Sequence, residues 1–255
     1  MHGAESHGKI CYLGDDHLDG AAAIYLAGIM RHYGLPFDHI RSDREPPAGF
    51  EEKPYSLYIV SDYPAARFQA GMMERLVGRV RQDGAGLVML GGWESYFGRL
   101  GEYQESPLAE ALPVVMQRSD DRRNQAQPCL IRQTADHPIL AGLPWDRPPG
   151  IGGFNAVQPK PNAATLLMSV QFSVRQTNGE FAFVRGEESP LLVVGEFGNG
   201  RTAALATDVA PHWVGGFVDW GDARIVQEIG NGFIEVGNWY AEFFRNLTVW
   251  IGKLE

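Results

Sequence analysis

The sequence predicts an α/β protein with a mostly parallel central sheet, helices on both faces of the sheet, and additional late β-hairpin strands. Strand-like and helical segments alternate along residues 9–90, which is typical of a parallel sheet with crossover helices. The strand-like runs are continuously apolar, as expected for strands buried on both faces. From Ala164 onward strand signals dominate, so we expect hairpin strands there.

Three apolar runs in the N-terminal part predict strands at residues 9–14, 56–61 and 87–90. Two helical segments separate them. The first covers residues 18–33, and the second carries an apolar stripe that recurs every four positions and should face the sheet. The residues of that stripe are Phe68, Met72, Leu76 and Val80.

The ends of these helices carry recognisable signals. Asp16 or Asp19 can cap the first helix by accepting hydrogen bonds from its free N–H groups, and Gly34 can end it. Pro64 suits the first turn of the second helix, where its missing N–H costs nothing. Gly84 ends that helix.

The middle of the chain is less regular. Residues 107–116 predict a short helix and a strand, residues 117–127 a polar loop, and residues 128–132 a strand. The Pro- and Gly-rich residues 137–154 predict a loop or short helical turns.

Later segments predict strands joined by turns. The motif EFGNGR predicts a tight hairpin, because Asn-Gly adopts positive φ at little cost. Residues 214–237 show no clean period. The final helix, 238–254, has an aromatic stripe that we interpret as core or as an oligomer surface. The strands expected here are 165–170, 181–184, 190–197 and 201–208.

Composition limits the function classes. The chain has 255 residues, of which 44% are hydrophobic, which fits one domain over residues 1–255. Its net charge of −9 argues against binding to nucleic acid or to anionic membranes. The basic run with Arg118, Arg122 and Arg123 is interpreted as a solvated loop. The sequence lacks an export signal and a long apolar run, so we expect a cytoplasmic protein.

No cofactor or metal is expected. The first strand is not followed by the glycine pattern of dinucleotide-binding proteins, and no phosphate-binding loop pattern occurs. Cys11 and Cys129 are isolated and show no zinc-ligand spacing. In DDHLDG, Asp15, His17 and Asp19 alternate as in a calcium loop, but the twelfth position is Leu26 instead of Glu.

Ligands of open parallel sheets bind beyond the carboxyl ends of the strands. This rule selects the loops after the strands at 9–14, 56–61, 87–90 and 201–208. A small polar ligand is the expected partner, and the aromatic side chains could stack on it. The candidate ligand-binding residues are Asp15, Asp62, Gly92, Trp93, Glu94, Ser95, Asp208, His212 and Trp213.

The stretch VMLGGWESYFG has the strand-to-turn setting of a nucleophile elbow. Such an elbow places Ser or Cys at its apex between small residues. Here the glycines are present, but the apex falls on Gly92 or Trp93, and neither can attack a carbonyl. Ser95 lies outside the required frame. We therefore expect the turn without the nucleophile.

Four blocks in order resemble the class I glutamine amidotransferase-like superfamily, and within it the group labelled putative glutamine amidotransferases, related to trehalose-utilisation-type domains. The blocks are LGGWESYFG, SPLAEALPVVM, DHPILAGLPW and ATDVAPHW. The resemblance implies a flavodoxin-like three-layer sandwich and, in active members, a Cys on the elbow with His and Glu spaced H-x-E. Here His212 fits the histidine, but Val214 stands where the Glu belongs.

Three hypotheses follow. The first is a protein without glutaminase activity that binds a small polar or sugar-like ligand, or a partner protein, in the former active-site crevice. The second is a hydrolase that uses Glu94 or Asp208 with His212 as acid and base. The third is a structural role in a homo-oligomer, through the aromatic C-terminal stripe and residues 214–237.

Overall fold

A nine-stranded sheet forms the centre of the computed structural model, which describes residues 8–16, 18 and 22–254. Its strands are β1 (Lys9–Gly14), β2 (Phe37–Ile40), β3 (Tyr55–Ser61), β4 (Gly86–Leu90), β6 (Arg122–Gln133), β7 (Gly150–Asn155), β9 (Ala164–Thr177), β10 (Glu180–Phe197) and β11 (Gly200–Leu205). They lie in the order β2-β1-β3-β4-β11-β10-β9-β6-β7. The pairs from β2 to β11 are parallel, and the pairs from β11 to β7 are antiparallel.

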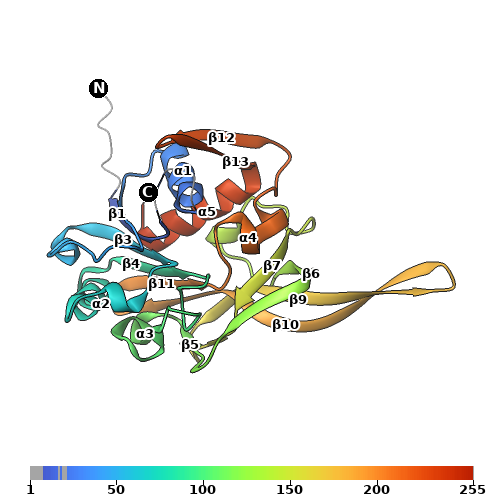
Figure 1. Cartoon of the computed structure of the whole chain (residues 1–255), viewed down its shortest axis with the longest axis horizontal. Coiled ribbons are helices and arrows are strands. Elements are labelled where there is room, and N and C mark those ends of the chain that lie inside the picture. The colour runs from blue at the N-terminus through green and yellow to red at the C-terminus, as the bar shows by residue number, and fades with distance from the viewer. Residues whose placement is uncertain (1–7, 17, 19–21, 255) are drawn as a thin grey trace.

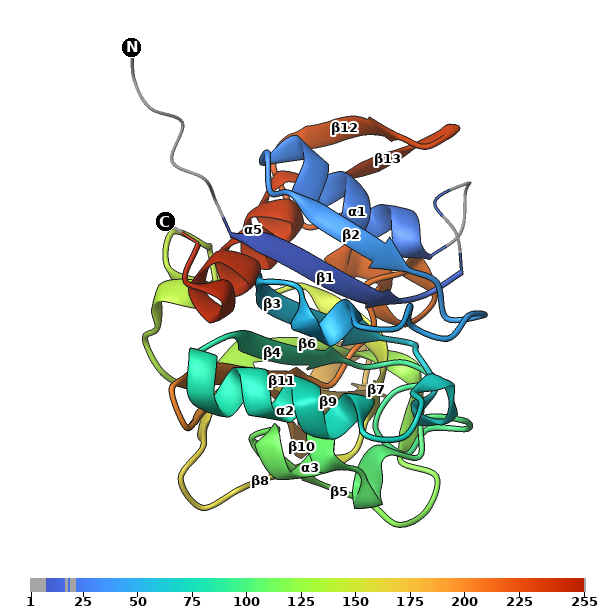
Figure 2. The ribbon, with the colours of Figure 1, turned by 90° about the vertical axis from the view of Figure 1, so that its left-hand side faces the viewer.

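Helices cover both faces of the parallel half, so the molecule has three layers (Figures 1 and 2). α1 and α5 lie on one face, and α2 and α3 lie on the other. The helices are α1 (Ala23–His32), α2 (Met72–Asp83), α3 (Pro107–Ala111), α4 (Pro211–Val214) and α5 (Asn238–Gly252), with short 3₁₀ turns at Phe50–Glu52, Ala65–Arg67, Tyr103–Glu105, Pro138–Leu140 and Gly215–Phe217. The predicted flavodoxin-like sandwich is confirmed.

Two small antiparallel ribbons complete the fold. β5 (Val114–Met116) pairs with β8 (Val157–Pro159), and β12 (Arg224–Ile229) pairs with β13 (Gly232–Gly237). The second ribbon covers the outer side of α1 (Figure 1). Among the described residues, no helix is long and apolar enough to cross a membrane.

Glycines allow the helices to approach the sheet closely. A Cβ on Gly86 in β4 would lie 2.4 Å from the carbonyl oxygen of Ile251 in α5. A Cβ on Gly200 in β11 would lie 2.6 Å from a methyl carbon of Val80 in α2. Neither distance is possible for a real side chain, so these two positions require glycine.

Both predicted helix starts were wrong. α1 begins at Ala23, and its N-cap Ala22 makes no side-chain hydrogen bond, so Asp16 does not cap it; Asp19 lies outside the described residues. α2 begins at Met72 instead of Pro64, because Gly71 with φ +79° separates the helix from a 3₁₀ turn. Phe68 therefore precedes the helix.

The predicted loops at 117–127 and 137–154 were wrong in part. β6 already begins at Arg122, and β7 occupies Gly150–Asn155. The first half of β6 is largely exposed and polar, and β7 contains three glycines. Neither segment therefore has the apolar pattern by which a strand is recognised.

The late strands match the prediction in kind, but β9 and β10 are longer than predicted, and β11 ends at Leu205 instead of residue 208. Residues 181–184 and 190–197 belong to one continuous strand, β10. The predicted hairpin at EFGNGR is confirmed, since Phe197 pairs with Gly200, although the positive φ falls on Gly198 and not on Asn199. Of the predicted stripe, Phe243 and Leu247 in α5 and Leu254 beyond its end are buried, as expected for core, whereas Trp239 and Trp250 are partly buried.

Candidate functional site

Three aspartates meet at the carboxyl edge of the parallel strands. Asp15 follows β1, Asp62 follows β3, and Asp208 lies three residues beyond β11. β1 and β3 are neighbours in the sheet, and β4 separates β3 from β11. The charge of Asp208 acts on both of the other carboxyl groups, which places all three in one cluster.

Each of these carboxyl groups is held by hydrogen bonds. Asp15 accepts from the hydroxyl groups of Tyr12 at 2.7 Å and Ser61 at 3.4 Å. One oxygen of Asp208 accepts from the backbone N–H groups of Val209 at 2.6 Å and Ala210 at 3.0 Å. These contacts fix the positions of the carboxyl groups at the edge of the sheet.

Burial makes ionisation of the cluster unfavourable. It raises the pKa of Asp15, Asp62 and Asp208 above the ordinary value, and the charge of Asp208 raises the pKa of Asp15 and Asp62 further. Hydrogen bonds from N–H and O–H donors oppose this effect without cancelling it. The three groups therefore retain protons to a higher pH than exposed aspartates do.

The elbow turn after β4 passes directly beside this cluster. Gly91 donates its N–H to the carbonyl oxygens of Leu205 at 2.8 Å and Thr207 at 3.0 Å. A Cβ on Gly92 would lie 2.0 Å from Oδ1 of Asp62. The glycine is needed because the Asp62 carboxylate occupies the space where a side chain would begin.

Side chains bind the backbone amides on both sides of Trp93. The N–H of Gly92 donates to Oδ1 of Asn155 at 2.9 Å, and the N–H of Glu94 donates to Oδ1 of Asp62 at 2.7 Å. Asn155 also donates to the carbonyl oxygen of Gly92 at 3.1 Å and to Asp121 at 2.8 Å. Both amides are thus occupied within the chain.

Asp121 holds the far side of the same turn. Its two carboxylate oxygens accept from the N–H groups of Phe97 at 3.1 Å and Gly98 at 3.0 Å. Asp121 is fully buried, and burial raises its pKa, although the hydrogen bond from Asn155 opposes this. Asn155 and Asp121 together fix the elbow from Gly92 to Gly98.

The Trp93 ring is 38% exposed at the surface of the site. The guanidinium of Arg122 lies 4.6 Å from the ring centroid, and the imidazole of His212 lies 6.1 Å away in an edge contact. Nδ1 of His212 is 3.4 Å from Oδ2 of Asp208. An exposed indole therefore stands next to the aspartate cluster, and His212 connects the two.

The structure brings six of the predicted residues together at this edge: Asp15, Asp62, Gly92, Trp93, Asp208 and His212. Ser95 lies beside them but is fully buried, with its hydroxyl oxygen accepting the N–H of Asp62 at 2.9 Å.

The two remaining candidates are Trp213 and Glu94. Trp213 is buried and donates its indole N–H to Asn124 at 2.8 Å, so its ring is not available to a ligand. Burial raises the pKa of Glu94, with a further increase from the charge of Asp16 and a decrease from that of Arg67, and the charge of Glu94 in turn raises the pKa of Asp62. No contact joins Glu94 to His212 in the part of the chain that the structure describes. His17 lies outside that part.

Sequence reasoning missed Asn155, Asp121 and Arg122 as parts of this site. Asn155 ends a strand that was predicted as loop, and Asp121 and Arg122 fall in the run interpreted as a solvated loop. Asp121 and Arg122 lie in the middle of the polar run 117–127, so no sequence signal distinguished them. The burial of Asp121 became visible only with the fold.

Neither cysteine lies in the loops that form this edge of the sheet. Cys11 in β1 and Cys129 in β6 are buried and free, and burial raises the pKa of both thiols. Within residues 8–16, 18 and 22–254, no group of three or more His, Cys, Asp or Glu side chains is arranged to hold a metal ion.

The three-layer sandwich and the elbow at the end of a central strand are the features expected of a class I glutamine amidotransferase-like protein. Residues 68–229, more than half of the chain, match the family described as "Putative glutamine amidotransferase". The chain belongs to this family. A search of curated proteins found no match.

Solved structures share the fold. The cytoplasmic protein STM3548 from Salmonella typhimurium matches with a TM-score of 0.74 and 22% identity, over 95% of this chain and 98% of its own. The cytoplasmic protein STM1381 from Salmonella typhimurium LT2 gives 0.72 and 24%, over 95% and 99%. The carbohydrate deacetylase Agd3 gives 0.51 and 14%, over 78% and 29%. At these identities the likeness concerns the fold alone.

Proposed function

We propose that this chain does not hydrolyse glutamine and instead binds a small polar ligand at the carboxyl edge of the parallel strands. The observation that carries the proposal is the elbow itself. The turn is intact, but it has no nucleophile, and the amides on both sides of its apex are bound by Asn155 and Asp62.

The occupied amides matter because amide hydrolysis needs more than a nucleophile. The developing oxyanion must be stabilised by free, preorganised N–H groups. A donor that already binds a side chain at 2.7 to 2.9 Å is not free for this role. The absent Cys, the Val214 in place of Glu and the bound amides support the same conclusion.

The chemistry of the edge favours a ligand rich in hydrogen-bond donors. Asp62, which is only partly buried, offers an oxygen acceptor, and the exposed Trp93 side chain offers a flat surface on which a sugar ring can stack. Groups with shifted pKa values concentrate at functional sites. A sugar or another small polyhydroxylated molecule is the ligand class that fits these groups. The cytoplasm is the compartment we propose, in keeping with the names of STM3548 and STM1381.

Two measurements test the proposal. Purified protein should release no ammonia from glutamine above background, and saturable release would overturn the first part. A thermal-shift screen of sugars, amino acids and nucleotides should find a sugar-class ligand. Asp62→Asn and Trp93→Ala should each weaken its binding about tenfold or more, whereas Asp83→Asn, at an exposed ion pair, should not.

A second candidate is the hydrolase that uses Asp208 and His212, and the 3.4 Å contact between them favours it. An aspartate that orients a histidine is a common element of general-base catalysis. The partner acid is the weak point, because Glu94 is under the influence of Asp16 and Arg67. Turnover of a sugar ester or glycoside that is lost in both His212→Ala and Glu94→Gln would favour this candidate over simple binding.

A further inference from the structure

Strands β9 and β10 extend well beyond the body of the molecule as a two-stranded arm, residues 171–188 (Figure 1). Every residue of the arm is exposed or only partly buried. An isolated two-stranded ribbon is only marginally stable in water. The arm therefore lacks the packing that stabilises the rest of the sheet.

The arm has one apolar face and one polar face. Residues directly paired across an antiparallel ladder share a face, and the faces alternate along each strand. Phe172 pairs with Arg185, Val174 with Phe183, and Gln176 with Phe181 on one face. The other face holds the pairs Ser173–Val184, Arg175–Ala182 and Thr177–Glu180. Such alternation is typical of a strand half covered by protein.

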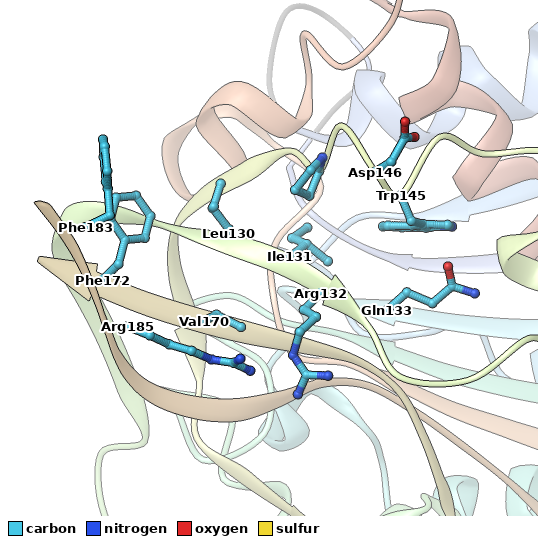
Figure 3. Close-up of a pocket in the computed structure, with 11 residues that line it drawn as sticks. Leu130, Ile131, Arg132, Gln133, Trp145, Asp146, Val170, Phe172, Phe183 and Arg185 are labelled. Atoms are coloured by element: carbon cyan, nitrogen blue, oxygen red, sulfur yellow. The ribbon is translucent and has the colours of Figure 1, made fainter.

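The apolar face of the arm continues into a pocket at its base. The pocket has a volume of about 660 Å³ and lies between the arm, β6 and the loop with Trp145 (Figure 3). Leu130 pairs with Val170, and Phe172 lies 6.1 Å from Phe183, so these residues extend the same face inward. One mainly apolar surface thus runs from the pocket to the tip, and it also carries Arg132 and Arg185, both paired with Glu188.

The two ends of this surface have complementary shapes. At the tip, Phe181 is 66% exposed and projects from the ribbon. At the base, the pocket is concave and walled by Trp145, Leu130 and Phe172. In a twofold-symmetric contact the same patch serves on both copies, so a surface that carries both a projection and a cavity can match itself when reversed.

We propose that two copies of this chain associate about a twofold axis through the apolar face of the arm, each placing Phe181 in the pocket of the other. The apolar face and the pocket walls supply 14 residues per copy, fewer than the roughly 20–30 per side of a standard interface, so the dimer should be weak and reversible. Face-to-face packing would cover Phe183, which is 72% exposed in the single chain. This surface is distinct from the aromatic helix α5, whose stripe is core.

The first test is the mass of the full chain between about 0.1 and about 100 µM, by light scattering and sedimentation. We expect a dimer. Phe183→Glu should raise its dissociation constant roughly 100-fold or more, because the carboxylate enters the interface twice. The matched control is Val184→Glu, the next residue on the polar face, which is 39% exposed and should change the constant less than about threefold.

A monomer at every concentration overturns the proposal, and so does equal weakening by the two variants. A shortened arm gives a second variant that keeps the fold. Ser173 and Val184 are paired, so an Asn-Gly turn can join them in place of residues 174–183. The shortened chain should be monomeric, and a shortened chain that still forms the dimer contradicts the proposal.

The second test locates the contact. Benzoylphenylalanine at position 181, activated by light in a mixture of labelled and unlabelled protein, should cross-link to residues 130–133 or 145–148 of another copy. Cross-links within one copy, or to residues 214–237 of another, contradict the proposed arrangement. Loss of dimerisation leaves the ligand test above unaffected, so the two proposals can fail separately.

Discussion

The parallel and antiparallel halves of the sheet place opposite kinds of side chain in unfavourable surroundings. At the carboxyl edge of the parallel half, Asp15, Asp62 and Asp208 are withdrawn from water. On the arm of the antiparallel half, Phe181 and Phe183 are exposed to water. Both arrangements cost free energy in the isolated chain. We infer that each half is adapted to a second molecule, a polar ligand at one and another copy at the other.

The largest effect is expected at the amide that holds the elbow. Asn155→Ala removes the partner of the Gly92 N–H, the Gly92 carbonyl and Asp121, all of them buried. Unfolding in urea should show a loss of about 3 kcal/mol, because buried polar groups are left without partners. Asn246→Ala, which removes an amide with two long contacts, 3.3 Å to Arg245 and 3.4 Å to Ala141, should change stability by less than about 0.5 kcal/mol. Equal losses of stability in the two variants would show that the hydrogen bonds of Asn155 do not stabilise the elbow more than an ordinary surface contact does.

The rate of proteolysis in the arm should depend on the residues of its apolar face rather than on the packing of the core. Arg175 lies on the polar face of the arm and offers trypsin a cleavage site. Under dimer-forming conditions, cleavage there should be about tenfold faster in Phe183→Glu than in the wild type, because unpaired arms open more often. Mass spectrometry of the fragments measures this rate. Val184→Glu should be cleaved at the wild-type rate, and faster cleavage of this control would point to a local effect of charge.

The aspartate cluster should make stability depend on pH. The folded-state pKa of Asp62 lies above its ordinary value of 3.8, so the folded chain holds the proton more tightly than the unfolded chain. This contribution is fully present below about pH 4 and is lost as the pH rises through the raised pKa. Asp62→Asn keeps an oxygen for the Glu94 N–H and removes the charge.

At pH 8 this variant should therefore be more stable than the wild type by on the order of 1 kcal/mol, and the difference should vanish near pH 4. Urea unfolding at several pH values measures it. Asp83→Asn should show no such trend. A variant that is less stable than the wild type at pH 8 would mean that the Asp62 charge stabilises the fold.

The smallest effect concerns the exposed indole. Arg122→Ala removes the guanidinium 4.6 Å from the Trp93 ring and should cost about 0.5 kcal/mol, with a change in Trp93 fluorescence. Arg123 is the matched control, because it donates to backbone carbonyls of Asp120 and Arg122 and makes no contact with Trp93. A fluorescence change in Arg123→Ala as large as in Arg122→Ala would contradict this assignment.

The parallel half of the sheet could be predicted from the sequence because its strands are buried on both faces. Continuous apolar runs such as LVML reveal these strands, and the residues after them follow from the rule on strand ends. Asp15, Asp62 and Asp208 were found in this way. Their mutual influence on pKa could not be predicted, since it depends on the strand order in space.

The antiparallel half was harder because its strands are exposed, rich in glycine, or both. β7 begins with GIGGF, which resembles a loop, and the start of β6 is polar. Asn155 and Asp121 lie in these two segments, so the support of the elbow was missed together with the strands. The apolar alternation of the arm is visible in the sequence, but its exposure is not.

The hydrogen bonds of Asn155 have a consequence for attempts to restore catalysis. Trp93→Cys would supply a thiol at the apex, but the Gly92 N–H would still be bound to Asn155 and position 214 would still lack a carboxylate. We expect that variant to release no ammonia from glutamine. Conversion into a glutaminase would need changes at the apex, at position 155 and at position 214 together. No one of these substitutions alone should give measurable glutaminase activity.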